Sequence, residues 1–240
     1  MSNRSLFIMV SLFCMLTAIV ARGDSNERSS QDEGIEFKST ITVSDDAIER
    51  AQYIVDQMLS NASAIREKMK AIGFKVEIIG KDQVLSDLPD YSNLKGKTTL
   101  DGRDYDKGTR GVGSKKLCSV GEENLLCLPG QRYRDEDVLV HEFSHSIMAH
   151  LDVSTQAMID LAYENASESK LYPDGIYMMR NSREYWAEGT QAWFDVTRRH
   201  DVNGGYNTRE KLKDHDPQLA SLLEQVYGST RISRYHGCAY

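Results

Sequence analysis

The stretch LVHEFSHSIMAH, Leu139–His150, decides the fold because it places ionisable side chains within an apolar run. Its hydrophobic residues continue around the whole helical circumference, which predicts a buried helix over residues 136–151. Burial removes His141, Glu142 and His145 from water, and such groups need polar or ionic partners to offset the lost hydration. The rest of the domain must therefore bring partners to this helix.

The spacing of the two histidines is typical of a metal site. Residues four apart share one face of an α-helix, so His141 and His145 can bind one ion together. Glu142 follows the first histidine, at the edge of that face, where it can take a proton from an attacking water. H-E-x-x-H is the arrangement found in zinc peptidases, and it predicts a bound zinc ion.

A third ligand is not supplied by the helix itself. The extended pattern H-E-x-x-H-x-x-G-x-x-H is excluded, because Met148 stands where that pattern has Gly and Leu151 where it has His. His150 lies about half a turn away from His141, so we expect it to face outward or to cap the end of the helix.

A second polar pattern lies in NSREYWAEGTQAWFD, residues 181–195. Its polar residues fall on one face of a predicted helix that is otherwise rich in aromatic residues, and they are Glu184, Glu188, Gln191 and Asp195. A polar stripe on such a helix needs a buried partner, and the histidines with their metal are the best candidate. Spacing alone leaves open whether Glu184 or Glu188 is the ligand.

These segments resemble the gluzincin zinc metallopeptidases, in particular the anthrax lethal factor-like catalytic domain. The matching parts are LVHEFSHSI, EYWAEGTQAWF and a tyrosine seven residues before the first glutamate of E-x-x-x-E. The resemblance implies that Glu184 is the third zinc ligand, that Glu188 supports the site, and that Tyr177 stabilises the oxyanion. Nothing here corresponds to the toxin's cell-binding and substrate-docking domains.

The fold class that follows is α+β and rich in helices, a zincin-like domain with a small sheet. Its H-E-x-x-H helix should pack against its E-x-x-x-E helix. The periodicity predicts one long helix over 44–73, a strand over 74–80, a long irregular loop over 89–116, and helices over 154–168, 182–200 and 217–227.

The N-terminal residues predict export from the cell. Residues 1–21 hold one arginine followed by an apolar run that is short for a membrane span, which is typical of a secretory signal peptide. Residues 22–43 are expected to be a disordered polar leader, and residues 44–240 a single metallopeptidase domain. No membrane contact is expected after the signal is cleaved.

Charge excludes one class of partner. The formal charge is -7, and loss of residues 1–21 removes one Arg and no acid, giving -8. An acidic chain of this kind is not expected to bind nucleic acid. The expected partner is a peptide or protein substrate. The sequence does not indicate the oligomeric state.

Three cysteines remain after signal cleavage. An oxidising compartment favours one disulfide among Cys118, Cys127 and Cys238, and the sequence leaves all three pairings open. Their spacing is not that of a zinc knuckle, so they are expected to be structural. Asn61 and Asn165 each begin a glycosylation sequon.

Two functions from different classes fit these patterns. The first is a secreted zinc metalloendopeptidase in which Glu142 and Tyr177 are catalytic. The second is an inactive secreted matrix or interaction protein that keeps the zinc-binding scaffold. Glu142 favours the enzyme, because a purely structural zinc site needs ligands but no general base.

Overall fold

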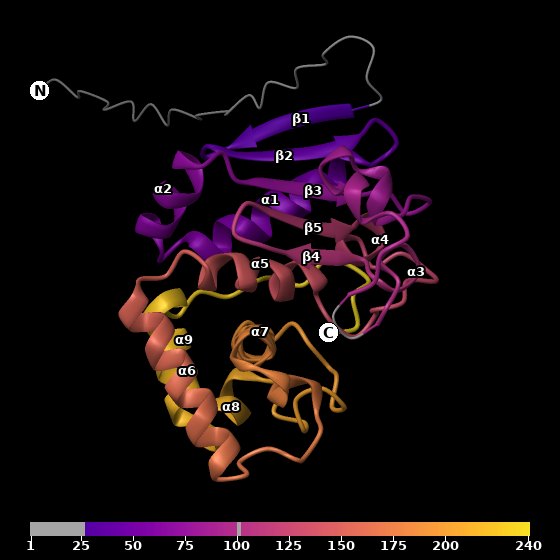
Figure 1. Cartoon of the computed structure of the whole chain (residues 1–240). Coiled ribbons are helices and arrows are strands. Elements are labelled where there is room, and N and C mark those ends of the chain that lie inside the picture. Colours follow the sequence, from indigo (N-terminus) through magenta and orange to yellow (C-terminus); the bar gives the residue numbers. More distant parts are fainter. Residues whose placement is uncertain (1–26, 100–101) are drawn as a thin grey trace, which may run out of the picture.

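A small sheet in the first half of the chain lies above a layer of helices from the second half (Figure 1). The computed structural model describes residues 27–99 and 102–240. The predicted signal peptide and the first residues of the predicted leader, up to residue 26, lie outside them. This arrangement confirms the α+β class.

The sheet has five strands in the order β1-β2-β3-β5-β4. The pairs β2–β3 and β3–β5 are parallel, while the two outer pairs are antiparallel. β4 therefore forms the edge nearest the helical layer (Figure 1). The strands are β1 (Glu27–Asp32), β2 (Ile35–Thr40), β3 (Lys75–Ile79), β4 (Gly111–Gly113) and β5 (Leu117–Gly121).

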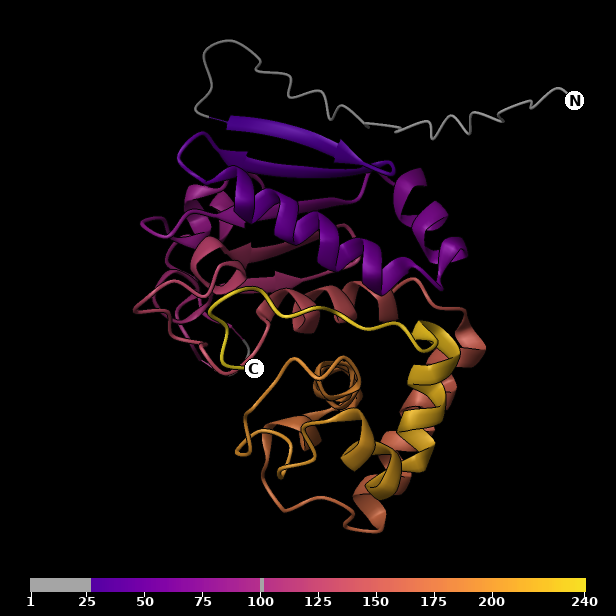
Figure 2. The same cartoon turned by 180° about the vertical axis from the view of Figure 1, so that it is seen from behind.

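The helices divide between the two halves. Figure 2 shows α1 lying across the sheet, and α5 packs against β4, β5 and α7 at the junction of the halves. The helices are α1 (Asp45–Leu59), α2 (Ser63–Ala71), α3 (Tyr105–Gly108), α4 (Glu122–Leu125), α5 (Val138–Met148), α6 (Val153–Glu168), α7 (Ser182–Trp193), α8 (Arg209–His215) and α9 (Pro217–Tyr227). Short 3-10 helices cover Leu85–Asp87, Pro89–Leu94 and Tyr177–Arg180. None of the helices described is long and apolar enough to cross a membrane.

The prediction of a disordered leader over 22–43 is wrong for its described part. β1 and β2 form an antiparallel hairpin that continues the sheet. Its turn is made by Glu33 and Gly34, both with positive φ, a conformation that suits a two-residue hairpin. Ile35 and Phe37 are buried on alternate positions of β2. The prediction from polar composition failed because polar residues can still form backbone hydrogen bonds in an outer strand.

The single helix predicted over 44–73 is broken in the structure. α1 begins after Ser44, whose side chain accepts from the Ala47 amide. It ends at Leu59, and α2 starts at Ser63 in a different direction. The apolar spacing runs through the break because Ala62 is also buried. Periodicity alone therefore could not reveal the break.

The loop predicted over 89–116 contains the short strand β4. Its sequence Gly-Val-Gly has little intrinsic preference for a strand. A Cβ at position 113 would lie 1.9 Å from the carbonyl oxygen of Glu142, and one at position 111 would lie 2.6 Å from Val138 Cγ1. The two glycines thus let the edge strand lie directly against α5. The predicted strand over 74–80 is confirmed as β3.

In the second half, α9 has the predicted bounds but α7 is shorter than predicted. α7 ends at Trp193, and Asp195 follows with a positive φ. The Val196 amide then donates to the Gln191 carbonyl, which closes the helix end. The α8 helix was not predicted.

The segment after α9 crosses back along α5 to the first half (Figures 1 and 2). A disulfide joins Cys127 to Cys238, which selects one of the three pairings left open by the sequence. Cys118 is buried and free. The Tyr240 side chain is fully buried, with its hydroxyl 3.4 Å from the Asp137 carboxylate at the start of α5.

We predict that Gly113→Ala destabilises the protein by about 1–3 kcal/mol, because the new methyl group must push β4 away from α5. Chemical denaturation measures this change. Gly108→Ala serves as the control, since the nearest atoms that its Cβ would meet outside its own helix are those of the Arg103 side chain, at 3.3–3.9 Å. Equal stability of Gly113→Ala and the wild type would contradict the close approach of strand and helix.

Candidate metal centre

Helix α5 holds two imidazoles in a fixed position. Its N-terminus is capped by the buried Asp137, whose side chain accepts from the Val140 amide. Every residue of α5 except Glu142 is buried, so the helix is held on all sides. The rings of His141 and His145 lie on one face with centroids 4.9 Å apart. The predicted helix and the pairing of its histidines are thus present.

Helix α7 brings carboxylates to this face. Asn181 caps its start by accepting from the amides of Arg183 and Glu184 at 3.0 Å. Two hydrogen bonds attach α7 to α5: Trp186 donates to the Ser144 carbonyl, and Gln191 donates to the Asp137 carbonyl. Because these two hydrogen bonds fix α7 against α5, they hold Glu184 close to the histidines.

The candidate ligand atoms lie close enough together to share one metal ion. Glu184 Oε2 lies 3.1 Å from His141 Nε2 and 3.5 Å from His145 Nε2, and one atom from each residue lies within 4.8 Å of the others. In a tetrahedral site with bonds of about 2.0–2.2 Å, ligand atoms stand about 3.3–3.6 Å apart. The three residues therefore form a group that can hold a metal ion.

The carboxylates around the two histidines favour a positive charge at this group. Burial opposes the ionised form of Glu184, but hydrogen bonds from His141 and His145 hold the pKa of its carboxyl well below the usual range. Burial likewise opposes a charge on His141, yet the hydrogen bond to Glu184 and the charges of Glu142 and Glu188 raise its pKa to about 10. Without an ion, a proton on the imidazole supplies the positive charge; a metal dication would supply it instead.

Glu188 lies behind the histidines, one helical turn after Glu184. Its Oε1 is 3.5 Å from His141 Nδ1, the ring nitrogen opposite the one that faces Glu184. The side chain is 1% exposed, and burial raises the pKa of its carboxyl to about 8. This position suits a group that orients the imidazole. It is less suited to direct coordination, since it contacts the far side of the ring.

Glu142 is held by the edge strand. Its Oε2 accepts from the Gly113 amide at 2.8 Å. The carboxylate lines the cleft together with His141 and His145. The sequence predicted Glu142 at the edge of the helix face that carries the two histidines. It did not predict the hydrogen bond with Gly113, because that bond joins residues far apart in the chain.

Tyr177 lies in the 3-10 helix before α7. Its ring centroid is 6.2 Å from that of His141, and the Arg180 guanidinium lies 5.3 Å from the ring. Burial and the negative charges of Glu184 and Glu142 raise the pKa of the phenol. The hydroxyl therefore stays protonated at neutral pH and can donate a hydrogen bond.

A cleft of about 1000 Å³ opens over these groups. It runs between the edge strand and α5 on one side and the Tyr177–Glu184 region on the other. Both Glu142 and Tyr177 line it, as do the three candidate ligands. A peptide-sized molecule can therefore reach all five side chains.

The last two residues of the predicted polar stripe, Gln191 and Asp195, do not reach the group formed by His141, His145 and Glu184. Gln191 donates to the start of α5, as described above. Asp195 lies beyond the end of α7, where its side chain accepts from the Arg209 amide and pairs with Arg231. His150 caps the end of its helix by bonding the Ser146 carbonyl at 2.8 Å, and it is buried, so the outward orientation is excluded.

Comparison with known proteins identifies a similar fold. The structure of the Pro-Pro endopeptidase PPEP-2 from Paenibacillus alvei matches with a TM-score of 0.56 and 15% sequence identity, over 79% of this chain and 96% of that chain. At this identity the likeness concerns the fold alone. The sequence matches no protein-family model and no curated protein. The chain is therefore similar in architecture to an endopeptidase.

Proposed function

We propose that this protein is a zinc-dependent metallopeptidase of the gluzincin type. The observation that carries the proposal is the meeting of His141 and His145 from α5 with Glu184 from α7, beside Glu142 in an open cleft. Two imidazoles and a carboxylate leave a coordination position for water or substrate, as catalytic zinc sites do. A structural site would normally use four protein ligands.

The residues divide the chemistry among them. Zinc at this site would act as a Lewis acid that polarises the peptide carbonyl and lowers the pKa of water. Glu142 accepts the proton of the attacking water and passes it to the nitrogen of the leaving amine. The Tyr177 hydroxyl donates to the oxygen on which negative charge develops. Glu188 keeps the His141 ring in its binding orientation.

We further propose that the protein acts outside the cell. The apolar N-terminal run supports export, and the Cys127–Cys238 disulfide suits an oxidising compartment. The Asn61 and Asn165 side chains, proposed to carry glycans, are exposed. The substrate on this proposal is an extracellular peptide or protein.

We predict about one equivalent of zinc per mature chain purified without chelators, since three such ligands should retain the ion through purification. Elemental analysis of folded protein measures it. Less than about a tenth of an equivalent in correctly folded protein would refute the site.

Glu142→Gln should keep the zinc and lower peptide hydrolysis about 100-fold or more, because the amide preserves shape but cannot accept a proton. Hydrolysis of a peptide library by the zinc-loaded protein provides the assay. Glu164→Gln, at an exposed position of α6, is the matched control and should retain full activity. Zinc-loaded wild-type protein that cleaves no peptide would favour the matrix function instead.

Glu184 and Glu188 should differ in their effects on zinc affinity. Glu184→Ala should lose the metal, because two histidines alone make an incomplete site. Glu188→Ala should weaken binding only about 10- to 100-fold, as expected for a group that orients a ligand. Competition with a chelator measures both constants. A greater loss in Glu188→Ala would reverse the two roles.

A further inference from the structure

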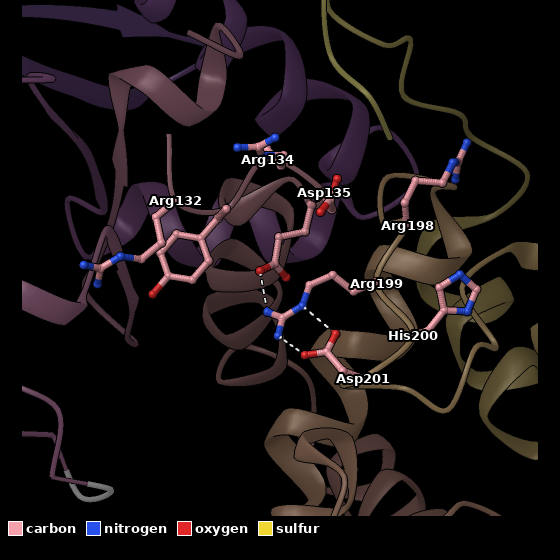
Figure 3. A pocket seen from close by; sticks show the side chains of 9 residues that line it. Arg132, Arg134, Asp135, Arg198, Arg199, His200 and Asp201 are labelled. Atoms are coloured by element: carbon pink, nitrogen blue, oxygen red, sulfur yellow. Dashed lines mark hydrogen bonds and ion pairs between the residues drawn. The ribbon is translucent and has the colours of Figure 1, made fainter. Parts of the chain in front are cut away.

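A buried acid on the central strand β3 has another acid as its partner. Glu136, which is 5% exposed, shows the usual arrangement of a buried acid: Arg199 Nη1 lies 2.7 Å from its Oε1, and the same guanidinium binds Asp201 (Figure 3). Glu77 is only 2% exposed, but its hydrogen bond is with Asp90. Its Oε2 has no hydrogen-bond partner in the described part of the chain. An acid buried in this way needs an explanation of its own.

The cations near Glu77 pair with Asp90. The strand register places Lys38 of β2 and Ser119 of β5 on either side of Glu77. Lys75 lies two residues before Glu77, on the same face of the sheet. Lys75 Nζ is 2.6 Å from Asp90 Oδ2, and Lys38 Nζ is 3.9 Å from the same oxygen. Both lysines therefore balance the charge of Asp90.

A proton on Glu77 makes the contact of the two acids possible, since two carboxyl groups can form a hydrogen bond only when one of them carries a proton. Hydrogen bonds from Glu77 and Lys75 lower the pKa of Asp90 to about 2. Burial and the contact with Asp90 raise the pKa of Glu77 to about 8. Tyr91 also faces this group, and burial raises the pKa of its phenol, so its hydroxyl stays neutral. At neutral pH the Glu77 carboxyl therefore donates to the Asp90 carboxylate.

Asp90 belongs to a segment that covers one face of the sheet. We call residues 85–94, which contain two of the 3-10 helices described above, the covering segment. Its buried apolar side chains form a small cluster with Ile79 that is separate from the main core, and they are Leu85, Leu88 and Tyr91. So few apolar contacts hold a segment weakly. The hydrogen bond between Glu77 and Asp90 is therefore a substantial part of its attachment to the sheet.

The covering segment also supports the rim of the metal cleft. Tyr105 and Val112 pack against its apolar cluster and line the cleft as well. The Asp106 carboxylate accepts from the Ser86 amide at 3.0 Å and from the Ser86 hydroxyl at 2.8 Å. Because Tyr105 and Asp106 both lie in α3, this helix is attached to the covering segment. A movement of the segment would therefore reach the cleft.

We propose that Glu77 is a proton switch that controls how firmly the covering segment binds the sheet and, through α3, the rim of the cleft. Neutral Glu77 holds Asp90 by a hydrogen bond. When its proton leaves to solvent, that bond is lost and two carboxylates of like charge face each other, so the segment opens more often. As a control of the cleft this inference rests on the proposed function, but the switch itself can be tested without any peptide.

The pH dependence of the switch has a definite sign. Opening returns the Glu77 carboxyl to water and to its ordinary pKa of 4.5, so the closed segment binds the proton more tightly than the open one. Closure is therefore strongest below about pH 4.5 and weakens as the pH rises to about 8, above which Glu77 is ionised in both states. Between these limits the equilibrium constant for opening should rise by up to about tenfold per pH unit.

Hydrogen exchange of the full chain measures this opening when each rate is divided by the intrinsic rate at the same pH. In the wild type, the hydrogen-bonded amides of Leu88 and Tyr91 should lose protection towards about tenfold per unit between about pH 5.5 and 7.5. Glu77→Gln keeps a donor for Asp90 but cannot ionise, so its protection should stay constant. Glu49→Gln, at an exposed position of α1, is the control and should behave like the wild type. The same pH dependence in Glu77→Gln and the wild type would overturn the proposal.

A titration of the wild type tests the switch even if Glu77→Gln fails to fold. Carbon-13 NMR of the side-chain carboxyl groups should show Glu77 losing its proton near pH 8. Titration near its ordinary value of 4.5 would reject the switch.

The connection to the cleft has its own measurement. The amides of Tyr105 and Gly108 in α3 should lose protection together with the covering segment, and Asp106→Ala should remove their response while the segment still responds. A response confined to the covering segment in the wild type would reject the control of the cleft. None of these measurements depends on zinc or on cleavage, so their failure would leave the proposed peptidase standing, and a protein that cleaves no peptide could still contain the switch.

Discussion

The buried group of imidazoles and carboxylates between α5 and α7 is the constraint on which the rest of the structure depends. His141 and His145 are almost wholly buried and face Glu184, while Glu188 lies behind them with 1% exposure. Ionised groups taken out of water must be balanced by opposite charge. The two helices therefore bring together residues that lie about forty positions apart in the chain and that one cation can satisfy.

The surroundings of this group can be understood as supports for its two helices. Asp137 caps α5 and is approached by the buried Arg50, at 3.7 Å, and by Tyr240. Gln191 of α7 bonds the same turn of backbone. The edge strand β4 reaches the opposite side of α5 because Gly111 and Gly113 have no side chains. Each support contacts the first turns of α5, which carry His141 and Glu142.

Local patterns in the sequence predicted the parts of the site that depend on a single helix. The four-residue spacing of His141 and His145, and the apolar surroundings that bury them, required no knowledge of the rest of the fold. Contacts between distant segments could not be predicted in this way. Sheet pairing places β4 beside α5, where the amide of Gly113 donates to Glu142. The hairpin of β1 and β2 is held by backbone hydrogen bonds, which the polar composition of these strands does not indicate. Asp195 left the predicted stripe because α7 ends in a turn that periodicity does not encode.

The disulfide between Cys127 and Cys238 encloses α5, α7 and all three candidate ligands in one loop, since the two cysteines are 111 positions apart. Closing a loop of this length restricts the unfolded chain and, in the chain-entropy model, contributes about 4–5 kcal/mol to stability. The unfolded protein would then keep His141, His145 and Glu184 within a confined volume, so these three side chains would meet again readily when the chain refolds. Under reducing conditions that confinement is lost, and the same chain would have to reassemble its metal group from a much larger set of conformations.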